Sequence, residues 1–213
     1  MNRPILWTFR RCPYAMRARL AIASADVDVE LREIVLRDKP QPFLNASAKG
    51  TVPVVETGEQ VIEESLDVML WALNQNDPEG WLDMTDEGFE LIAQADGPFK
   101  KALDLYKYAS RHADVDAIAE RELGGRFVKE LNDMLNEQAF LFGTGPRLAD
   151  MAILPFVRQF AHVDLAWFQE QPWPHLLVWL DAFKASDRFQ SIMTKYDPWA
   201  IGQTPVAFPQ KAG

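Results

Sequence analysis

The stretch Ile5–Ala15 reads ILWTFRRCPYA, and it decides how the first third of the chain folds. Its opening apolar run, Ile5–Phe9, predicts a short buried strand. Pro13 suits the first position of a helix, where its missing N–H costs no hydrogen bond, so a helix is predicted over Pro13–Ser24. Cys12 is therefore expected at the N-cap of that helix, directly after the strand.

Cys12 is the only cysteine among the 213 residues. Unsatisfied N–H groups and the positive end of the helix dipole both favour a thiolate at a helix N-terminus. Arg10 and Arg11 add positive charge beside it. The alternative is a buried cysteine that acts as a small hydrophobic side chain. The order strand, cysteine, proline, helix favours a reactive thiol over that alternative.

Composition narrows the class of protein. With 48% hydrophobic and 25% charged residues the chain is an ordinary globular protein, and one cysteine cannot form an internal disulfide. The sequence shows no signal peptide and no apolar run long enough to cross a bilayer, so a cytoplasmic location is expected. Of the net charge of −9, residues 1–75 carry −1 and the remainder −8. The acidic second half argues against nucleic acid and anionic membrane as partners.

The first third alternates between strand and helix patterns, which predicts a two-layer α/β domain over residues 1–75. Further strands are predicted at Val29–Val35, Val52–Val55 and Gln60–Ile62, and further helices around Pro42–Ala46 and over Glu63–Asn74. Residues 76–84 are polar and rich in turn formers, which predicts a linker.

The rest, residues 85–213, is predicted to be all-helical, with a proline-containing tail that wraps the surface after Tyr196. The predicted helices are one from Thr85 kinked at Gly97-Pro98, then Asp114–Gln138, a buried one over Leu148–Val157, Trp173–Ser186 and Arg188–Lys195.

A second candidate feature is Gly50–Val55, which reads GTVPVV. A proline that opens a strand cannot occupy a central ladder position in the ordinary way. If the Val52–Pro53 bond is cis, the backbone groups of Val52 turn outward and can pair with an extended peptide. An ordinary trans proline at a strand edge is the alternative.

Two further features could bind a charged ligand. A helix that begins at Glu63-Glu64-Ser65 can hold a carboxylate on its N–H groups and on the Ser65 hydroxyl, while Glu64 receives an ammonium group. Lys39, in the loop LRDKP, could meet a second carboxylate. The alternatives are acids that merely complement the helix dipole and a solvated surface lysine.

Together these motifs resemble the glutathione transferase superfamily, and the resemblance extends over the whole chain. It combines Cys12-Pro13-Tyr14-Ala15, the Val52-Pro53 turn and Glu64-Ser65 with a later Leu148-Ala149-Asp150 motif. The Cys-Pro-aromatic-Ala sequence looks most like omega-type and related bacterial members. The resemblance implies a thioredoxin-like α/β domain followed by an all-α domain.

The resemblance also implies roles for the matched residues, with glutathione as cosubstrate and no metal. Cys12 would form a mixed disulfide with glutathione, and Val52, next to Pro53, would pair with its cysteinyl backbone. Glu64 and Ser65 would hold the γ-glutamyl end, and Lys39 would hold the glycine carboxylate.

Two departures from the family pattern bear on this assignment. Ala15 replaces the second cysteine of dithiol glutaredoxins, so a second glutathione must resolve the adduct. Arg147 replaces the Ser or Thr that usually caps the helix of the Leu-Ala-Asp motif, which puts the reciprocal cap in question.

The implied function is glutathione-dependent thiol transfer through Cys12, acting on a small-molecule or glutathionylated substrate such as dehydroascorbate. Conjugation of glutathione to electrophiles and a non-catalytic interaction module are the alternatives. Phe9, Phe99 and Tyr106 are candidates for the acceptor pocket, with core packing as the other interpretation. A homodimer is expected, partly because a single chain is not expected to bury Trp71 and Trp81 fully.

Overall fold

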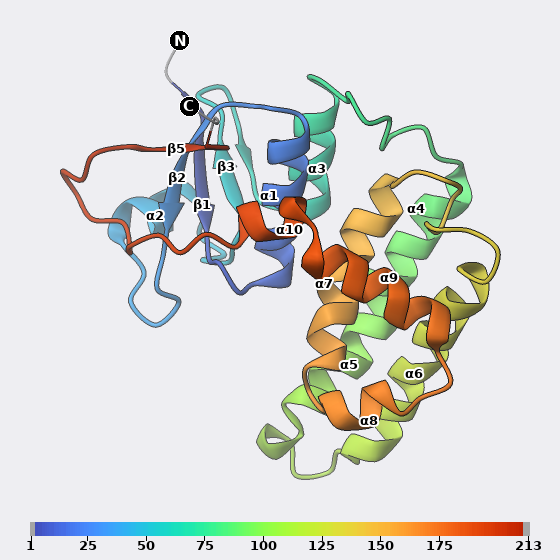
Figure 1. The fold of residues 1–213 in the computed structure, drawn as a ribbon. Helices are drawn as coiled ribbons and strands as arrows, with labels where there is room; N and C mark the ends of the chain where they lie inside the picture. The colour runs from blue at the N-terminus through green and yellow to red at the C-terminus, as the bar shows by residue number, and fades with distance from the viewer. Residues whose placement is uncertain (1–2, 211–213) are drawn as a thin grey trace. The chain divides into compact units, whose positions relative to one another are not determined.

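The computed structural model describes residues 3–210, and these residues form two compact units. Among the described residues, the first unit comprises 3–79 with 187–210, and the second comprises Gly80–Ser186. Figure 1 shows the course of the chain through both. Within the described residues no helix is both long and apolar enough to cross a membrane.

The first unit contains a five-stranded sheet in the order β4-β3-β1-β2-β5. Strands β1 and β2 are parallel, and the other neighbours are antiparallel. Their bounds are Ile5–Thr8 for β1, Val29–Glu33 for β2, Val54–Glu56 for β3, Val61–Ile62 for β4 and Val206–Phe208 for β5. The four strands predicted for this domain are all present, in the predicted order along the chain. The bounds differ by one or two residues: β1 ends at Thr8 and β2 at Glu33, while β3 begins at Val54 and ends at Glu56, and β4 begins at Val61.

The helices of this unit are α1 (Pro13–Ser24), α2 (Gln41–Ala46), α3 (Ser65–Leu73) and α10 (Asp187–Ile192). Helices α1 and α3 lie side by side and pack against each other (Figure 1). Nearly the whole of α1 is buried from Ala15 to Ile22. Phe43 of α2 packs against Trp7 of β1, with ring centroids 5.6 Å apart. The predicted α/β arrangement of the first domain is therefore confirmed.

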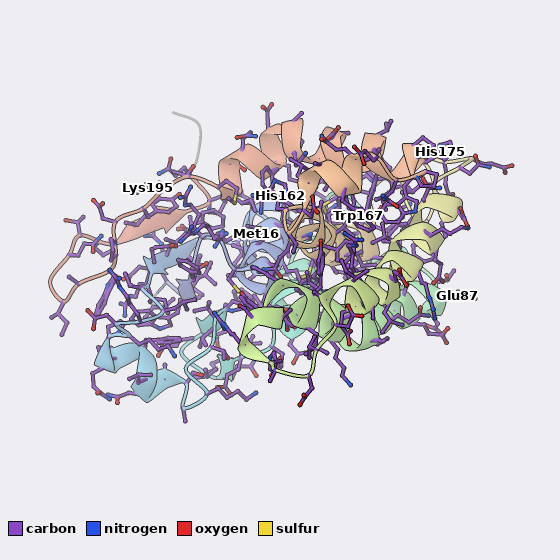
Figure 2. The ribbon with its side chains drawn as sticks, turned by 90° about the horizontal axis from the view of Figure 1, so that it is seen from below. Met16, Glu87, His162, Trp167, His175 and Lys195 are labelled. Atoms are coloured by element: carbon purple, nitrogen blue, oxygen red, sulfur yellow. The ribbon has the colours of Figure 1, made fainter. Side chains whose placement is uncertain are left out.

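The C-terminal segment differs from the prediction. The sequence assigns it to the helical domain as a surface wrap, whereas the described residues 187–210 group with the first unit. The segment leads from α10, past Lys195 (labelled in Figure 2), to β5. There Phe208 pairs with Val29 and Val206 with Leu31. Figure 1 shows this return to the sheet in red. The unpaired edge of β2 supplies the hydrogen-bond partners that a three-residue strand needs.

The second unit is built from helices. Their bounds are α4 Asp86–Gln94, α5 Lys100–Lys107, α6 Ala117–Met134, α7 Leu148–Ala161, α8 Leu165–Gln169 and α9 Pro174–Ala185, with a short 3₁₀ turn at Ala109–Arg111. A π-helical turn, Ala95–Phe99, joins α4 to α5 and contains Pro98. The predicted interruption at Gly97-Pro98 is thus confirmed and takes the form of a wider turn.

Helix α6 is shorter than the predicted Asp114–Gln138. It begins after Asp116, whose carboxylate accepts hydrogen bonds from the N–H groups of Ile118 and Ala119. An acidic N-cap of this kind fixes where a helix starts. Helix α7 is buried on nearly all sides, as predicted, and extends to Ala161.

Aromatic rings fill the core of the second unit. Phe160 lies within 6.2 Å, centroid to centroid, of several other rings, and Trp167, labelled in Figure 2, is one of them. Phe99 stacks on Phe127 with centroids 4.8 Å apart. Aromatic pairs at these distances stabilise a core beyond their buried area alone.

Candidate active site

Cys12 occupies the N-cap of α1, as the sequence predicts. A turn brings it there, because its N–H donates to the carbonyl of Phe9 at 3.0 Å. The thiol is partly exposed and is not part of a disulfide. It packs beside the buried cluster that contains Trp7, Phe43 and Val54. The geometry combines access for a reactant with the positive end of a helix.

The segment around Pro53 comes to the same place. The Val52–Pro53 bond is cis, and the Cys12 sulfur lies 3.7 Å from the carbonyl oxygen of Val52. Gly50 has a φ of +60°, a conformation that side chains rarely tolerate. A Cβ at Gly50 would lie 3.4 Å from the Nζ of Lys39, so the lysine lies against the start of this segment.

The start of α3 holds the other predicted residues. Glu64 is the N-cap and Ser65 the first residue of the helix. The guanidinium of Arg17 donates to the Ser65 hydroxyl at 3.5 Å, so a cation from α1 lies beside this helix start. The N–H groups, the hydroxyl and the cation together suit an anionic group.

Glu64 already has a partner. Its carboxylate accepts from Lys49 at 2.7 Å, and this hydrogen bond and charge raise the pKa of Lys49. Both side chains are more than half exposed, so solvent screens the pair. A ligand ammonium at Glu64 would therefore compete with Lys49.

Phe9, Phe99 and Tyr106 lie in different surroundings. Phe9 is half-buried in the first unit, next to the guanidinium of Arg11. Phe99 and Tyr106 belong to the core of the second unit, where burial raises the pKa of Tyr106. Phe99 also lines a cavity of about 410 Å³ between α5 and α6. A role for the three rings in an acceptor pocket stays a prediction.

Asp150 of the Leu-Ala-Asp motif is fully buried at the start of α7. It accepts hydrogen bonds from the N–H groups of Leu141 and Arg147, each at 2.9 Å, and from Trp179 Nε1 at 3.1 Å. The carboxylate half of the cap is therefore present. An arginine side chain has no acceptor to complete the other half. The Arg147 guanidinium instead donates to the carbonyl of Gly80 at 3.1 Å.

Sequence reasoning missed four charged residues near the site, namely Arg17, Arg19, Glu33 and Lys49. The available signal was two arginines inside the otherwise apolar run Ala15–Ile22. Both are buried, at 0% and 1% exposure. A buried arginine is rare unless polar groups surround it, so both mark a polar site within the α/β unit.

No group of three His, Cys, Asp or Glu side chains that could hold a metal occurs in residues 3–210. The arrangement that is present can hold a thiolate and an anionic peptide. The partly exposed thiol of Cys12 lies at the start of α1, next to the backbone carbonyl of Val52. The start of α3, at Ser65, belongs to the same unit.

Comparison with known proteins gives two matches to family models. Residues 6–80 match the glutathione S-transferase N-terminal domain, and residues 112–182 match the glutathione S-transferase C-terminal domain, together more than half of the chain.

Individual relatives agree with these models. Glutathione S-transferase omega-2 of Homo sapiens is 37% identical over 62 residues, which span 29% of this chain and 26% of that protein. Glutathione S-transferase omega-1 of Mus musculus is 24% identical over 84% of this chain and 75% of its own length. The crystal structure of glutathione transferase Omega 3C from Trametes versicolor has the same fold. Its TM-score is 0.77 at 14% identity, covering 94% of this chain and 93% of that one.

Proposed function

Since this chain belongs to the glutathione S-transferase family, with a relationship to its omega class, we propose that it is a cysteine-type enzyme that carries out glutathione-dependent thiol transfer. The observation that carries the proposal is Cys12 at the N-cap of α1, 3.7 Å from the Val52 carbonyl. A thiol in that position is favoured as thiolate by the helix N-terminus, and thiolate is the form that attacks disulfides.

The proposed reaction has two steps. The Cys12 thiolate attacks the glutathione sulfur of a glutathionylated substrate, forming a Cys12–glutathione disulfide and releasing the substrate thiolate, which takes a proton. The thiolate of a second glutathione then attacks that disulfide, which releases Cys12 thiolate and oxidised glutathione. Ala15 leaves no second cysteine nearby, so glutathione must be the resolving thiol.

The proposed binding mode follows the geometry of the first unit. The cysteinyl backbone of glutathione pairs with Val52, beside Pro53, and the γ-glutamyl carboxylate lies on the N–H groups of α3 with the Ser65 hydroxyl. Its ammonium takes the place of Lys49 at Glu64. Lys39, against Gly50, receives the glycine carboxylate.

The sequence supports a cytoplasmic, homodimeric enzyme with roles in redox balance and detoxification, and these remain parts of the proposal. Trp81 is fully buried within a single chain, so it no longer supports the expectation of a dimer. Trp71 remains half-buried on α3.

The test compares wild type with Cys12→Ser and Cys12→Ala in three assays run side by side. These measure reduction of a glutathionylated peptide, reduction of dehydroascorbate, and conjugation of an aromatic electrophile. We expect wild type to be active in the first two and both variants to lose that activity, since neither a hydroxyl nor a methyl can form the mixed disulfide. Conjugation that persists or rises only in the serine variant fits a hydroxyl that hydrogen-bonds glutathione. Full thiol-transfer activity in Cys12→Ser would show that Cys12 is not the nucleophile, and conjugation would then replace thiol transfer as the proposed function.

A further inference from the structure

A buried arginine lies under the turn that carries Cys12. Arg19, on α1, is 1% exposed and directs its guanidinium at the backbone between β1 and Cys12. It donates to the Thr8 hydroxyl, to the carbonyl of Phe9 at 3.4 Å and to the carbonyl of Arg10 at 2.6 Å. Three successive residues of the turn are therefore held by one side chain. Because the guanidinium is planar and has five donors, it can hold all three at once.

The same arginine fixes the C-terminal segment. Its Nε donates to the carbonyl of Ile192 at 3.0 Å, at the end of α10. A few residues further on, the N–H of Trp199 donates to the Glu33 carbonyl at 2.7 Å. The Trp199 ring packs edge-on against Trp7 with centroids 5.1 Å apart. The C-terminal segment is thus bound to Arg19 and to Glu33, the two residues that form the polar core of this unit.

Glu33 holds the turn from the other side. It is the last residue of β2 and 8% exposed, and its carboxylate accepts from the N–H of Arg10 at 2.7 Å. Burial raises the pKa of Glu33, while Arg10 and Arg19 lower it. Arg10 therefore has its carbonyl held by Arg19 and its N–H held by Glu33. Both peptide groups that flank this residue of the turn are thus fixed.

Arg19 also interacts electrostatically with Cys12. Burial lowers the pKa of Arg19 to about 10, whereas attraction to Glu33, Cys12 and Tyr196 raises it and Arg10 lowers it. Arg19 therefore stays charged at neutral pH. Attraction between two groups is mutual, so a cation that a Cys12 thiolate stabilises also stabilises that thiolate. Arg11, although next to Cys12 in sequence, is exposed, and water screens its charge.

We propose that Arg19 and Glu33 are positioning residues for Cys12: together they fix the turn 8–12, and their opposed charges set how readily Cys12 becomes a thiolate. The proposal builds on the role of Cys12 in the proposed function and adds the two residues that prepare it. Arg19 favours the thiolate and Glu33 opposes it, because the Glu33 carboxylate offsets the Arg19 charge. The two effects have opposite signs.

A purely structural role would behave differently. If Arg19 and Glu33 only stabilised the fold, removing either would lower the melting temperature without moving the titration of Cys12. If the substitutions acted only by loosening the turn, the pH midpoint of Cys12 alkylation would shift in the same direction in the Arg19 and Glu33 variants. The pH dependence of the Cys12 reaction separates these possibilities.

The experiment uses the full chain and the variants Arg19→Gln, Arg19→Lys and Glu33→Gln. Alkylation by iodoacetamide is followed by intact mass as a function of pH, without glutathione. The chain has one cysteine, so the mass change reports that thiol alone. Circular dichroism confirms that each variant is folded. Arg3→Gln is the control, because it removes an arginine of the same unit that is exposed and pairs with the exposed Asp28.

We expect Arg19→Gln to move the alkylation midpoint upward by about one pH unit, which lowers the rate below the midpoint roughly tenfold. Arg19→Lys keeps the charge and moves it less. Glu33→Gln keeps an oxygen acceptor for Arg10 but removes the negative charge, so its midpoint moves downward. Arg3→Gln leaves the midpoint unchanged.

An unchanged midpoint in folded Arg19→Gln, or shifts of the same sign in the Arg19 and Glu33 variants, would overturn the proposal. If Arg19→Gln does not fold, Arg19→Lys and Glu33→Gln decide it by the same rule. The alkylation assay requires no glutathione, so it tests the positioning role of Arg19 and Glu33 separately from the proposed thiol-transfer activity. Opposite shifts in a protein without thiol-transfer activity would leave the positioning role standing and remove the assigned reaction.

Discussion

Replacing Asp150 by asparagine should destabilise the protein by an amount that shrinks as pH rises. The carboxylate is fully buried and accepts three hydrogen bonds. In the asparagine variant an amide NH₂ replaces one of the two carboxylate oxygens, which puts a donor against a donor. At least one buried N–H then loses its partner, at a cost of about 1–3 kcal/mol.

The pH dependence follows from the protonation of Asp150. Burial raises its pKa to about 6, against the lowering effect of its three donors. The folded state therefore binds this proton more tightly than the unfolded chain, whose aspartate has a pKa of about 3.8. The stability that the protonated group contributes is complete below about pH 3.8 and is lost as pH rises through about 6. A difference of roughly two pKa units corresponds to about 3 kcal/mol.

The assay is urea denaturation followed by tryptophan fluorescence at about pH 4.5 and about pH 7.5, on either side of the raised pKa. Because asparagine does not titrate, the difference in unfolding free energy between wild type and Asp150→Asn isolates this one group. That difference should be larger at the lower pH. Asp133→Asn is the matched control, since Asp133 is exposed and its hydrogen bond to Lys129 lowers its pKa. Asp133 is therefore ionised at both pH values, and the effect of its substitution should be nearly the same at both. A destabilisation by Asp150→Asn that grows with pH would refute the reasoning, because it would mean that the three donors outweigh burial.

Two further outcomes are expected. The double variant Glu64→Gln with Ser65→Ala should bind glutathione at least about tenfold more weakly by calorimetry, since loss of a charge-assisted hydrogen bond costs about 1.5–3 kcal/mol. Glu59→Gln, an exposed carboxylate of the hairpin between β3 and β4, is its control, and equal affinity of the double variant and the control would place the ligand elsewhere. The protein should also be a homodimer, which light scattering at micromolar concentration checks. A monomer there would remove this part of the proposal.

Local pattern was enough to predict the elements that hold Cys12. An apolar run, then a cysteine and a proline before a helical repeat, leave little choice of conformation, and Cys12 is at the N-cap as predicted. The special backbone of the Gly50–Val55 segment could also be anticipated. Glycine permits backbone angles that other residues avoid, and proline lacks the N–H that a central strand position needs.

Contacts between distant segments could not be predicted. The three residues of β5 form a strand only because β2 offers an open edge, and no local pattern announces that pairing. The environment of Arg19 likewise depends on Ile192, which is 173 positions away along the chain. The pairing of Glu64 with Lys49 depends on the loop before Gly50 lying next to the start of α3. In each case the deciding interaction lies outside the local sequence.

The central claim is that glutathione becomes covalently attached to Cys12, and intact mass measurement tests it most directly. The protein is incubated with oxidised glutathione near neutral pH, and its mass is recorded before and after addition of excess reduced glutathione. The account predicts one glutathione adduct per chain, absent from Cys12→Ser, that reduced glutathione removes with release of oxidised glutathione. Turnover of a glutathionylated substrate by wild-type protein that never carries this adduct would contradict the account.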